Sequence, residues 1–377
     1  MPDKHAFLSP SSADRWIHCP PSQRLNALIA DKGTSYTQEG TEAHLLCEYE
    51  LKHALGADMD DPRPNLQYYD QEMQDAADGY RDFIIGLLKD YKDAGKEPFI
   101  CIEQHLDYSK WVGGNGFGTG DCLIVTDGTL KVIDFKYGVG VVVDANKNAQ
   151  MMCYSLGALD MFDDLYDIDT ISMTIYQPRR ANISTYEMSR DDLLKWATDV
   201  LSPAAKLASA GQGEFNCGPW CRFCKIKGTC RKRAKENMEM AKYEFLETVM
   251  LDPDDISFIL SKIEELLSWA EDFKKDALNE ALGGAKIPNF KLVAGRSNRT
   301  YTDEDQVAKR VKKEGYDPYD HKLKGVTAMT KMLGKKEFND LLSDLITKPQ
   351  GKPVLVPDTD PREALIPAED EFKGETE

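Results

Sequence analysis

The chain has 377 residues, which allows two or three domains of about 100–200 residues each. It carries 47 Lys and Arg against 64 Asp and Glu, so its net charge of −17 argues against a protein that sequesters nucleic acid on a globally basic surface. A nucleic-acid enzyme remains open, because bound cations and local patches set the local field. No apolar run approaches the roughly 18 residues of a membrane helix, and the N-terminus has no apolar signal core. We therefore expect no membrane partner and a cytoplasmic location.

Hydrophobic periodicity predicts an alternation of helices and strands. In chain order we expect helices at 38–55 and 70–94, strands at 98–104, 118–126 and 129–136, a helix at 145–160, a strand at 171–177, an edge strand at 183–188, helices at 190–209 and 254–282, a short strand at 287–294, and helices at 302–313 and 326–346. This order is typical of an α/β fold with a mixed central sheet flanked by helices. We divide the chain into a core at 1–235, a mostly helical accessory region at 236–350, and an acidic tail at 351–377 that we expect to be disordered.

The strongest local signal is a predicted hairpin over residues 118–138. Asp127-Gly128 separates its two apolar runs, and this dipeptide favours a two-residue type I′ loop in which Thr126 faces Thr129. The same register places Asp121 opposite Asp134, with Cβ atoms roughly 5 Å apart. Lys136 shares their face because side chains alternate along a strand. Apolar residues on both faces predict a central, buried hairpin.

Two carboxylates this close must be compensated by a positive charge. They repel by about 3 kcal/mol at an effective dielectric near 20, so either Lys136 or a divalent cation is needed. Mg²⁺ typically takes one or two protein carboxylates and completes its shell with water and substrate phosphate. A neighbouring lysine can orient or polarise the attacking water, as metal-assisted phosphodiester hydrolysis requires. The alternative is an edge hairpin with a solvated ion pair.

Four sequence elements in this order resemble the motifs of the PD-(D/E)XK nuclease superfamily, in its RecB-like branch. The elements are Gly40 to His44 (motif I), Gly120-Asp121 (motif II), Asp134-Phe135-Lys136 (motif III) and Gln150 with Tyr154 (motif IV). A lone Asp-x-Lys is a weak signal, whereas four elements over about 115 residues are specific. The resemblance implies a restriction-endonuclease-like core with a Mg²⁺- or Mn²⁺-dependent active site.

The resemblance also implies a role for each residue. Asp121, Asp134 and the main-chain carbonyl of Phe135 are the implied metal ligands, joined by His44; Lys136 is the implied catalytic lysine; Gln150 and Tyr154 are implied to brace the site and approach DNA. Glu103, on the preceding strand, is a further acidic candidate, for which a solvated strand-end carboxylate is the alternative.

Nine cysteines occur in the chain, and four of them, Cys217, Cys221, Cys224 and Cys230, are clustered. Clustered thiols in a reducing compartment predict Zn²⁺ or an iron–sulfur cluster. One interpretation is a Cys₄ zinc knuckle. The other places Cys19 with Cys221, Cys224 and Cys230 around a [4Fe–4S] cluster. It resembles the iron–sulfur RecB-like nucleases, which include AddB-type helicase–nuclease subunits and CRISPR-associated exonucleases. Cys217 has no place in that pattern and is an alternative ligand.

The cysteine segment is also the one strongly basic stretch of the chain. Residues 221–235 contain no acid and seven cations: Arg222, Lys225, Lys227, Arg231, Lys232, Arg233 and Lys235. Such a patch predicts contact with a phosphate backbone. The alternative is a solvated charged helix.

These features predict a metal-dependent DNA nuclease, acting as an exonuclease on single strands or DNA ends. The alternatives are a non-catalytic DNA-binding or recruitment module on the same fold and a Cys₄ zinc-binding regulator. Nearly the whole chain also resembles a family of phage and prophage proteins described mostly as a domain of unknown function. That resemblance implies a role in phage replication or recombination in the bacterial cytoplasm. Its implied partners are DNA and a phage single-strand-binding or annealing protein.

Overall fold

The computed structural model describes residues 6–30, 35–239, 253–293, 303–313, 318–319 and 325–346. The chain divides into two compact units, one formed by Met1–Glu244 with Leu267–Lys291 and the other by Phe245–Leu266 with Leu292–Glu377. The sheet and every predicted site residue lie in the first unit.

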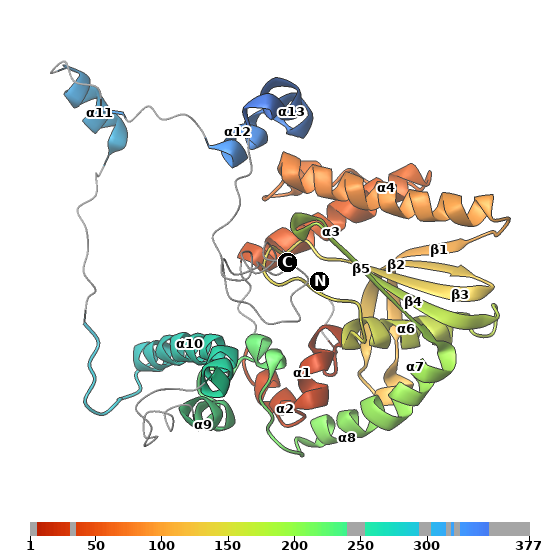
Figure 1. Ribbon diagram of the computed structural model, residues 1–377, viewed down its shortest axis with the longest axis horizontal. Coiled ribbons are helices and arrows are strands. Elements are labelled where there is room, and N and C mark those ends of the chain that lie inside the picture. Colours follow the sequence, from red (N-terminus) through yellow and green to blue (C-terminus); the bar gives the residue numbers. More distant parts are fainter. Residues whose placement is uncertain are drawn as a thin grey trace, which may run out of the picture. The chain divides into compact units, whose positions relative to one another are not determined.

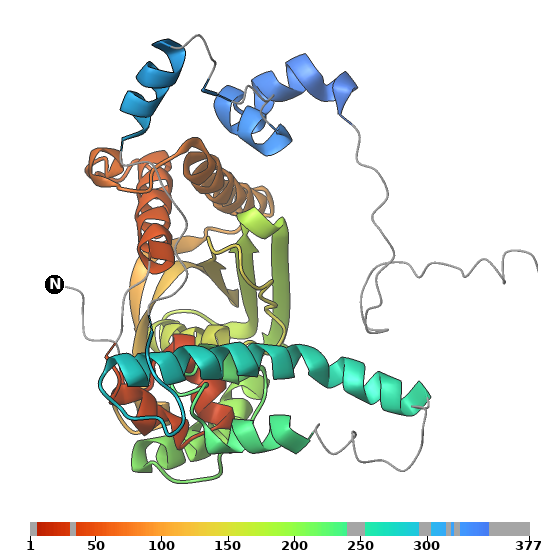
Figure 2. The same ribbon diagram turned by 90° about the vertical axis from the view of Figure 1, so that its left-hand side faces the viewer.

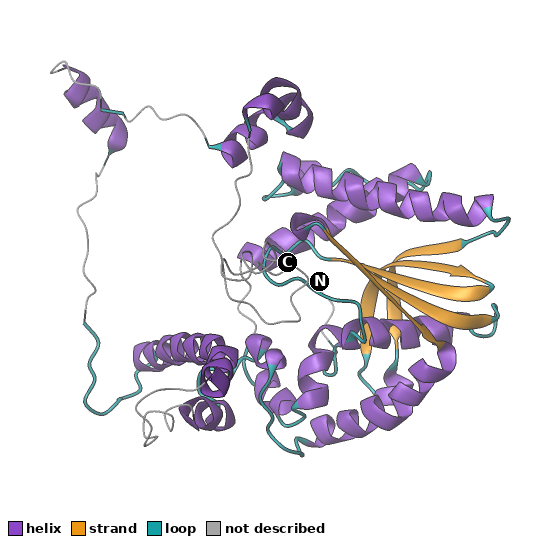
Figure 3. Cartoon of the chain, viewed as in Figure 1, coloured by secondary structure: helices purple, strands orange, loops and turns teal. Residues whose placement is uncertain are grey.

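A five-stranded mixed sheet forms the centre of the first unit (Figures 1 and 3). Its strands are β1 (Phe99–Asp107), β2 (Phe117–Thr126), β3 (Gly128–Phe135), β4 (Ile168–Gln177) and β5 (Asn182–Ser189), in the spatial order β1-β2-β3-β4-β5. Only β3 and β4 pair in parallel; the other neighbours are antiparallel. A parallel pair needs a crossover, which α6 (Ala149–Phe162) supplies. The predicted mixed α/β sheet flanked by helices is confirmed.

Helices cover both faces of the sheet (Figure 2). One face packs against α3 (Ser35–Ala54) and α4 (Gln71–Asp93). The other packs against η1 (Pro10–Ser12), α1 (Ala13–His18), α6, α7 (Arg190–Trp196), a π-helical turn η4 (Ala197–Leu201) and α8 (Ser202–Ala210). The remaining short elements of this unit are α2 (Ser22–Ala27), η2 (Arg63–Asn65), α5 (Ser109–Val112), η3 (Pro178–Arg180), η5 (Pro219–Phe223) and α9 (Arg231–Glu239).

Local signals in the sequence fix the starts of two helices that cover the sheet, α4 and α6. Asp70 caps α4 by accepting a hydrogen bond from the Met73 N–H, and the helix buries an apolar stripe that includes Tyr80 and Ile84. Asn148 caps α6 by accepting from two backbone N–H groups of the first turn. This cap fixes the start of α6 immediately before Gln150.

Two details beyond the sheet differ from the sequence-based expectations, and a third is not tested. The segment 287–293 contains no strand, and residue 294 lies outside the described residues. The helix expected over 326–346 is interrupted by Gly334, whose φ of 77° ends α12 (Val326–Leu333) before α13 (Lys335–Leu342). The expected disordered tail lies outside the described residues. The other helices are α10 (Pro253–Leu282) and α11 (Glu304–Lys313), followed at the end by η7 (Ser343–Leu345).

Gly157 of α6 allows the close approach of this helix to β1. A Cβ atom there would lie 3.0 Å from Leu106 Cβ and 3.1 Å from its carbonyl carbon. We expect Gly157→Val to lower the free energy of unfolding by about 1–3 kcal/mol, because the backbone of β1 must move. Gly86→Val is the matched control, since nothing lies within 4 Å of the Cβ position at Gly86 on α4. Denaturant unfolding measures both variants, and equal stabilities would contradict the expectation.

Candidate active site

The hairpin has the predicted register over the pairs that it forms, and the expected pair of Asp121 with Asp134 is not among them. Its ladder runs from Thr126 opposite Thr129 to Cys122 opposite Ile133, and both strand faces are buried. The predicted turn type is wrong, because within the turn only Gly128 has a positive φ, 85°, whereas type I′ needs two such residues. Gly128 instead begins β3, where its N–H donates to the Asp167 carbonyl 2.5 Å away. The register does not depend on this difference.

The alternation of side chains inverts at Glu103 and Asp121. Cys122 packs in the cluster with α3 and α4, whereas a Cβ at Gly120 would meet Leu106, which packs in the α6 cluster. On the neighbouring strand β1, Ile102 pairs with Cys122 and Gln104 pairs with Gly120. The residue between them, Glu103, adopts a φ of 51°, a left-handed conformation that is uncommon outside glycine. The inversion lets Asp121 reach α3, while the end of β3 faces α6. The two helical layers therefore both contribute side chains at this end of the hairpin.

On the α3 side, Asp121 forms a cluster with His44 and Glu103. One ligand atom from each residue lies within 4.8 Å of the others, and Asp121 Oδ1 is 3.3 Å from His44 Nδ1. Burial lowers the pKa of His44, but the Asp121 charge outweighs it and raises the pKa to about 9. Burial and the Asp121 carboxylate raise the pKa of Glu103 to about 8. Burial opposes ionisation of Asp121, yet His44 and Lys136 hold its pKa below the usual value.

On the α6 side, Asp134 and Lys136 form a buried ion pair with Gln150. Lys136 Nζ lies 2.9 Å from Asp134 Oδ2 and donates to Gln150 Oε1 at 3.1 Å. The Gln150 amide donates to Asp134 Oδ1 at 3.5 Å and to the Tyr154 hydroxyl at 3.1 Å. Burial raises the pKa of Asp134 despite the lysine. Apart from the ion pair, Asp134 Oδ2 has no hydrogen-bond partner among the described residues.

Phe135 joins the two groups through its backbone. Its N–H donates to Asp121 Oδ2 at 2.6 Å, which fixes the carboxylate beside β3. Nothing in the sequence signals this contact, because any residue at position 135 has the same N–H. The predicted metal-ligand role of the Phe135 carbonyl stays a prediction.

The site is suited to a divalent cation. Two carboxylates, Asp121 and Glu103, converge with His44, and Asp134 interacts electrostatically with Asp121 and His44 from the α6 side. Oxygen donors with one imidazole suit Mg²⁺ or Mn²⁺. The buried Asp134 carboxylate is contacted at Oδ2 by Lys136 and at Oδ1 by Gln150, and each of its oxygens has a second lone pair that a cation can use. Lys136 supplies positive charge on the protein side, and His44, protonated beside Asp121, loses its proton when it binds a metal.

The cysteine segment contacts the first helices of the chain. Its residues 216–225 lie against residues 18–26. His18 stacks on Trp220 with ring centroids 4.3 Å apart, and the Asn216 amide donates to the His18 carbonyl. Buried Asn26 donates to Cys224 Sγ at 3.3 Å and accepts from the Lys225 N–H at 2.7 Å. These contacts connect residues about 200 positions apart in the sequence.

Five thiols interact electrostatically at this junction. The charges of Cys224 and Cys19 affect the pKa of Cys221, and those of Cys221 and Cys230 affect the pKa of Cys217. Burial raises the pKa of Cys221. Arg15, which sequence reasoning missed, is buried beside Cys19 and Cys224 and donates to Ser22 and Gln23. Among the described residues, no three of these sulfur atoms lie within 4.8 Å of one another.

The structure corrects part of the predicted basic surface. Arg233 is only 2% exposed, and its guanidinium pairs with Asp272 at 2.8 Å, so it cannot contact a DNA phosphate. Lys227 pairs with the same carboxylate, Lys225 Nζ donates to the Ile29 carbonyl, and Lys232 pairs with Glu236 one turn later. The side chains of Arg222 and Arg231 are exposed. Some cations of this run therefore stabilise the fold by pairing with carboxylates. The sequence spacing of the cations does not indicate which ones do so.

Replacing Arg233 with alanine is expected to destabilise the fold. The change leaves Asp272 with Lys227 alone, and loss of one partner from a buried ion pair costs about 3–5 kcal/mol at most. Arg231→Ala, on the exposed part of the same helix, should change the free energy of unfolding by less than about 0.5 kcal/mol. Chemical denaturation of both variants provides the test; an Arg233 variant as stable as the Arg231 variant would refute the structural role.

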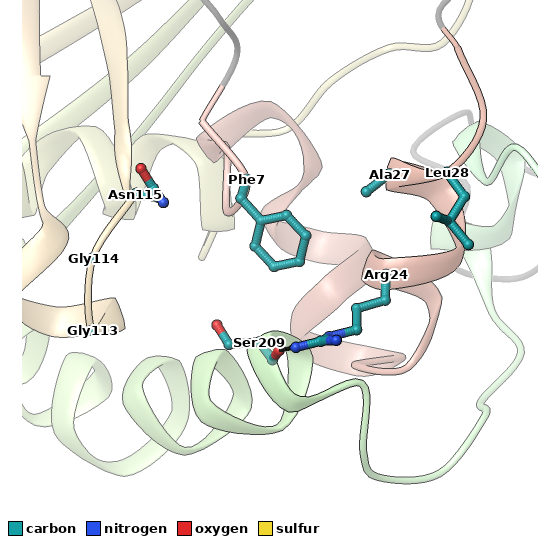
Figure 4. A pocket seen from close by; sticks show the side chains of 8 residues that line it. All are labelled: Phe7, Arg24, Ala27, Leu28, Gly113, Gly114, Asn115 and Ser209. Atoms are coloured by element: carbon teal, nitrogen blue, oxygen red, sulfur yellow. Dashed lines mark hydrogen bonds between the residues drawn. The ribbon is translucent and has the colours of Figure 1, made fainter.

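A separate hollow of about 550 Å³ lies away from these residues (Figure 4). Figure 4 shows Arg24 reaching toward Ser209, whose carbonyl accepts from its guanidinium at 2.6 and 2.8 Å. Among its described lining residues Arg24 alone is charged, and its bonds tie α2 to the end of α8. The lining residues are Phe7, Arg24, Ala27, Leu28, Gly113, Gly114, Asn115 and Ser209.

Comparison with known proteins identifies a family and several solved structures, of which one is described here. The model of the family described as "Protein of unknown function (DUF2800)" matches residues 5–363, which confirms the expected family of unknown function. The structure titled "Crystal structure of SSO0001" is 15% identical, with 50% of this chain and 94% of that chain covered and a TM-score of 0.23. A TM-score this low does not establish a shared fold. Within the described residues, no helix combines the length and apolarity needed to cross a bilayer.

Proposed function

We propose that this chain, which belongs to the DUF2800 family, is a divalent-metal-dependent deoxyribonuclease of the PD-(D/E)XK superfamily, in its RecB-like branch. The observation that carries the proposal is the convergence at one end of the β2–β3 hairpin. Asp121, Asp134 and Lys136 meet His44 from α3 and Gln150 from α6 there. These five residues come from all four motifs of the resemblance. We further propose exonuclease action on single strands or DNA ends during phage replication or recombination.

The residues fit a Mg²⁺ or Mn²⁺ ion. Asp121, Asp134 and the Phe135 carbonyl are the proposed ligands, with His44 and Glu103 on the α3 side. When bound, the cation supplies Lewis-acid stabilisation of the scissile phosphate and lowers the pKa of a coordinated water. Glu103 is the weaker candidate, because it reaches the cluster only through a strained backbone conformation.

The chain's own residues orient the reaction. Lys136, held between Asp134 and Gln150, places an ammonium where it can hydrogen-bond the attacking water and offset negative charge that develops on the phosphate. Gln150 fixes both members of the ion pair, and Tyr154 fixes Gln150. Preorganised groups of this kind need no rearrangement during the reaction.

We also propose a [4Fe–4S] cluster at Cys19, Cys221, Cys224 and Cys230. A tetrahedral zinc site with Zn–S bonds near 2.3 Å places its sulfur atoms about 3.8 Å apart. No three of the described thiols lie within 4.8 Å of one another, which favours the wider ligand spacing of a cluster. The positive charge of buried Arg15 suits an anionic thiolate group beside Cys19 and Cys224. Cys217 is half-buried and remains the alternative ligand.

End-labelled DNA tests the proposed function. Anaerobically purified protein should release label from single- or double-stranded DNA with Mg²⁺ or Mn²⁺ and not with a chelator. Asp121→Asn should abolish the release, because it removes a charged ligand. Asp127→Asn, in the exposed turn of the same hairpin, is the matched control and should retain it. No cleavage by folded, cluster-loaded wild type would reject the nuclease and favour a DNA-binding module.

A further inference from the structure

An exposed apolar loop follows Lys136 directly. The five residues Gly138 to Val142 carry no polar side chain, and all are exposed. The valines Val139, Val141 and Val142 expose 46, 41 and 50% of their surface. Consecutive exposed apolar residues are costly in a globular protein unless they serve a function.

Hydrogen bonds from the side chains of Gln177 and Asn182 hold the backbone of this loop in one conformation. Gln177, 2% exposed at the end of β4, donates to the carbonyls of both Gly138 and Val141 and accepts from the Val143 N–H. Asn182 of β5 donates to the Val143 carbonyl at 2.9 Å. Because these side chains satisfy the backbone groups on the protein side, the valines are presented outward on a fixed support.

The loop also lies beside the proposed active site. It leaves the sheet at the end of β3, and the Lys136 N–H still donates to the Tyr176 carbonyl of β4 at 2.9 Å. Gly138 is two residues from Lys136, so their Cα atoms are at most about 7 Å apart. The loop therefore begins two residues from the proposed catalytic lysine, at the end of the sheet where the DNA strand would bind.

We propose that the loop Gly138–Val142 is a wedge that unstacks the terminal base pair of duplex DNA as one strand enters the active site. Aliphatic side chains inserted between base steps serve this purpose in other DNA-binding proteins, where they offset the cost of unstacking. An uncharged loop suits bases, whereas phosphates require cations. The inference rests on the proposed nuclease function and adds its substrate class, duplex ends that must be opened.

A fluorescence experiment tests the wedge without cleavage. The full chain carrying Lys136→Ala is mixed with a duplex that has 2-aminopurine in its terminal pair, in Mg²⁺. Fluorescence should rise on binding, because the base leaves the stack. A triple change, Val139→Ser, Val141→Ser and Val142→Ser, should abolish the rise. The control triple changes Leu165, Val200 and Leu207 to Ser; these exposed residues lie elsewhere in the first unit.

A kinetic arm uses the same changes in the active protein. The loop triple should lower the hydrolysis rate on blunt duplex about tenfold or more and leave the rate on single strands within about twofold. Bound duplex without a fluorescence rise, or a rise retained by the loop triple, would overturn the wedge while leaving the nuclease intact. Absence of metal-dependent hydrolysis on both substrates would instead reject the nuclease, and the wedge with it.

Discussion

Replacing Lys136 with alanine should lower metal-dependent hydrolysis of DNA by about 10³-fold, the loss expected when a preorganised charged donor is removed from a reaction centre. Lys136 Nζ is the cation nearest to Asp134, at 2.9 Å, and Gln150 holds it in place. Its removal leaves Asp134 buried without an ion-pair partner, so part of the loss comes from altered charge at the metal site. Initial rates on end-labelled single-stranded DNA measure the effect.

Lys131→Ala provides the matched control for this prediction. Lys131 lies on β3, the strand that precedes Lys136, and its Nζ donates to Ser172 of β4 at 2.8 Å instead of to a site residue. We expect its rate to stay within about twofold of wild type. Calorimetric titration of Lys136→Ala with Mn²⁺ shows whether the lower rate comes from a slower hydrolysis step or from weaker metal binding. Wild-type rates in the Lys136 variant would show that the site is not catalytic.

The sequence predicted the part of the site that depends on simple periodicity. Asp127-Gly128 locates the turn, and a strand period of two then sets the pairing of every later residue up to Cys122 and Ile133. The actual turn geometry differs from type I′, yet the pairing is unchanged. The i and i+4 spacing of Gln150 and Tyr154 likewise predicts their contact, which a 3.1 Å hydrogen bond forms.

Other features of the site depend on contacts that no local pattern encodes. Glu103 turns toward His44 because its φ is 51°, and glutamate carries no sequence signal for that conformation. Arg233 belongs to a run of cations, but its partner Asp272 is on a helix nearly forty residues away. Asn26 hydrogen-bonds Cys224 and Lys225 almost 200 residues away, and Arg15 lies beside Cys19 and Cys224. Long-range partners of polar residues are therefore what the structure adds.

Replacing Cys19 with alanine should remove the iron–sulfur cluster and destabilise the first unit. A link from Cys19 to Cys224 closes a loop of about 200 residues, and constraint of a loop this long contributes at most about 5 kcal/mol by the chain-entropy model. The His18–Trp220 stack and the Asn26 hydrogen bonds remain, so we expect a smaller loss, of about 2–4 kcal/mol. Iron content, visible absorbance and denaturant unfolding of anaerobically purified protein report the change.

Two further cysteines separate the cluster from its alternatives. Cys153→Ala, buried in α6 away from the segment, should keep the iron and lose only the packing of one small side chain. Cys217→Ser should also keep the iron if Cys19 is the fourth ligand, and it should lose the metal if the four clustered cysteines hold Zn²⁺. Purified wild type that contains zinc and no iron, with Cys19→Ala unchanged in metal content, would establish the zinc knuckle. Cys19→Ala and Cys217→Ser together therefore decide which metal is bound. They also decide whether the start of the chain is bonded through that metal to the end of the core.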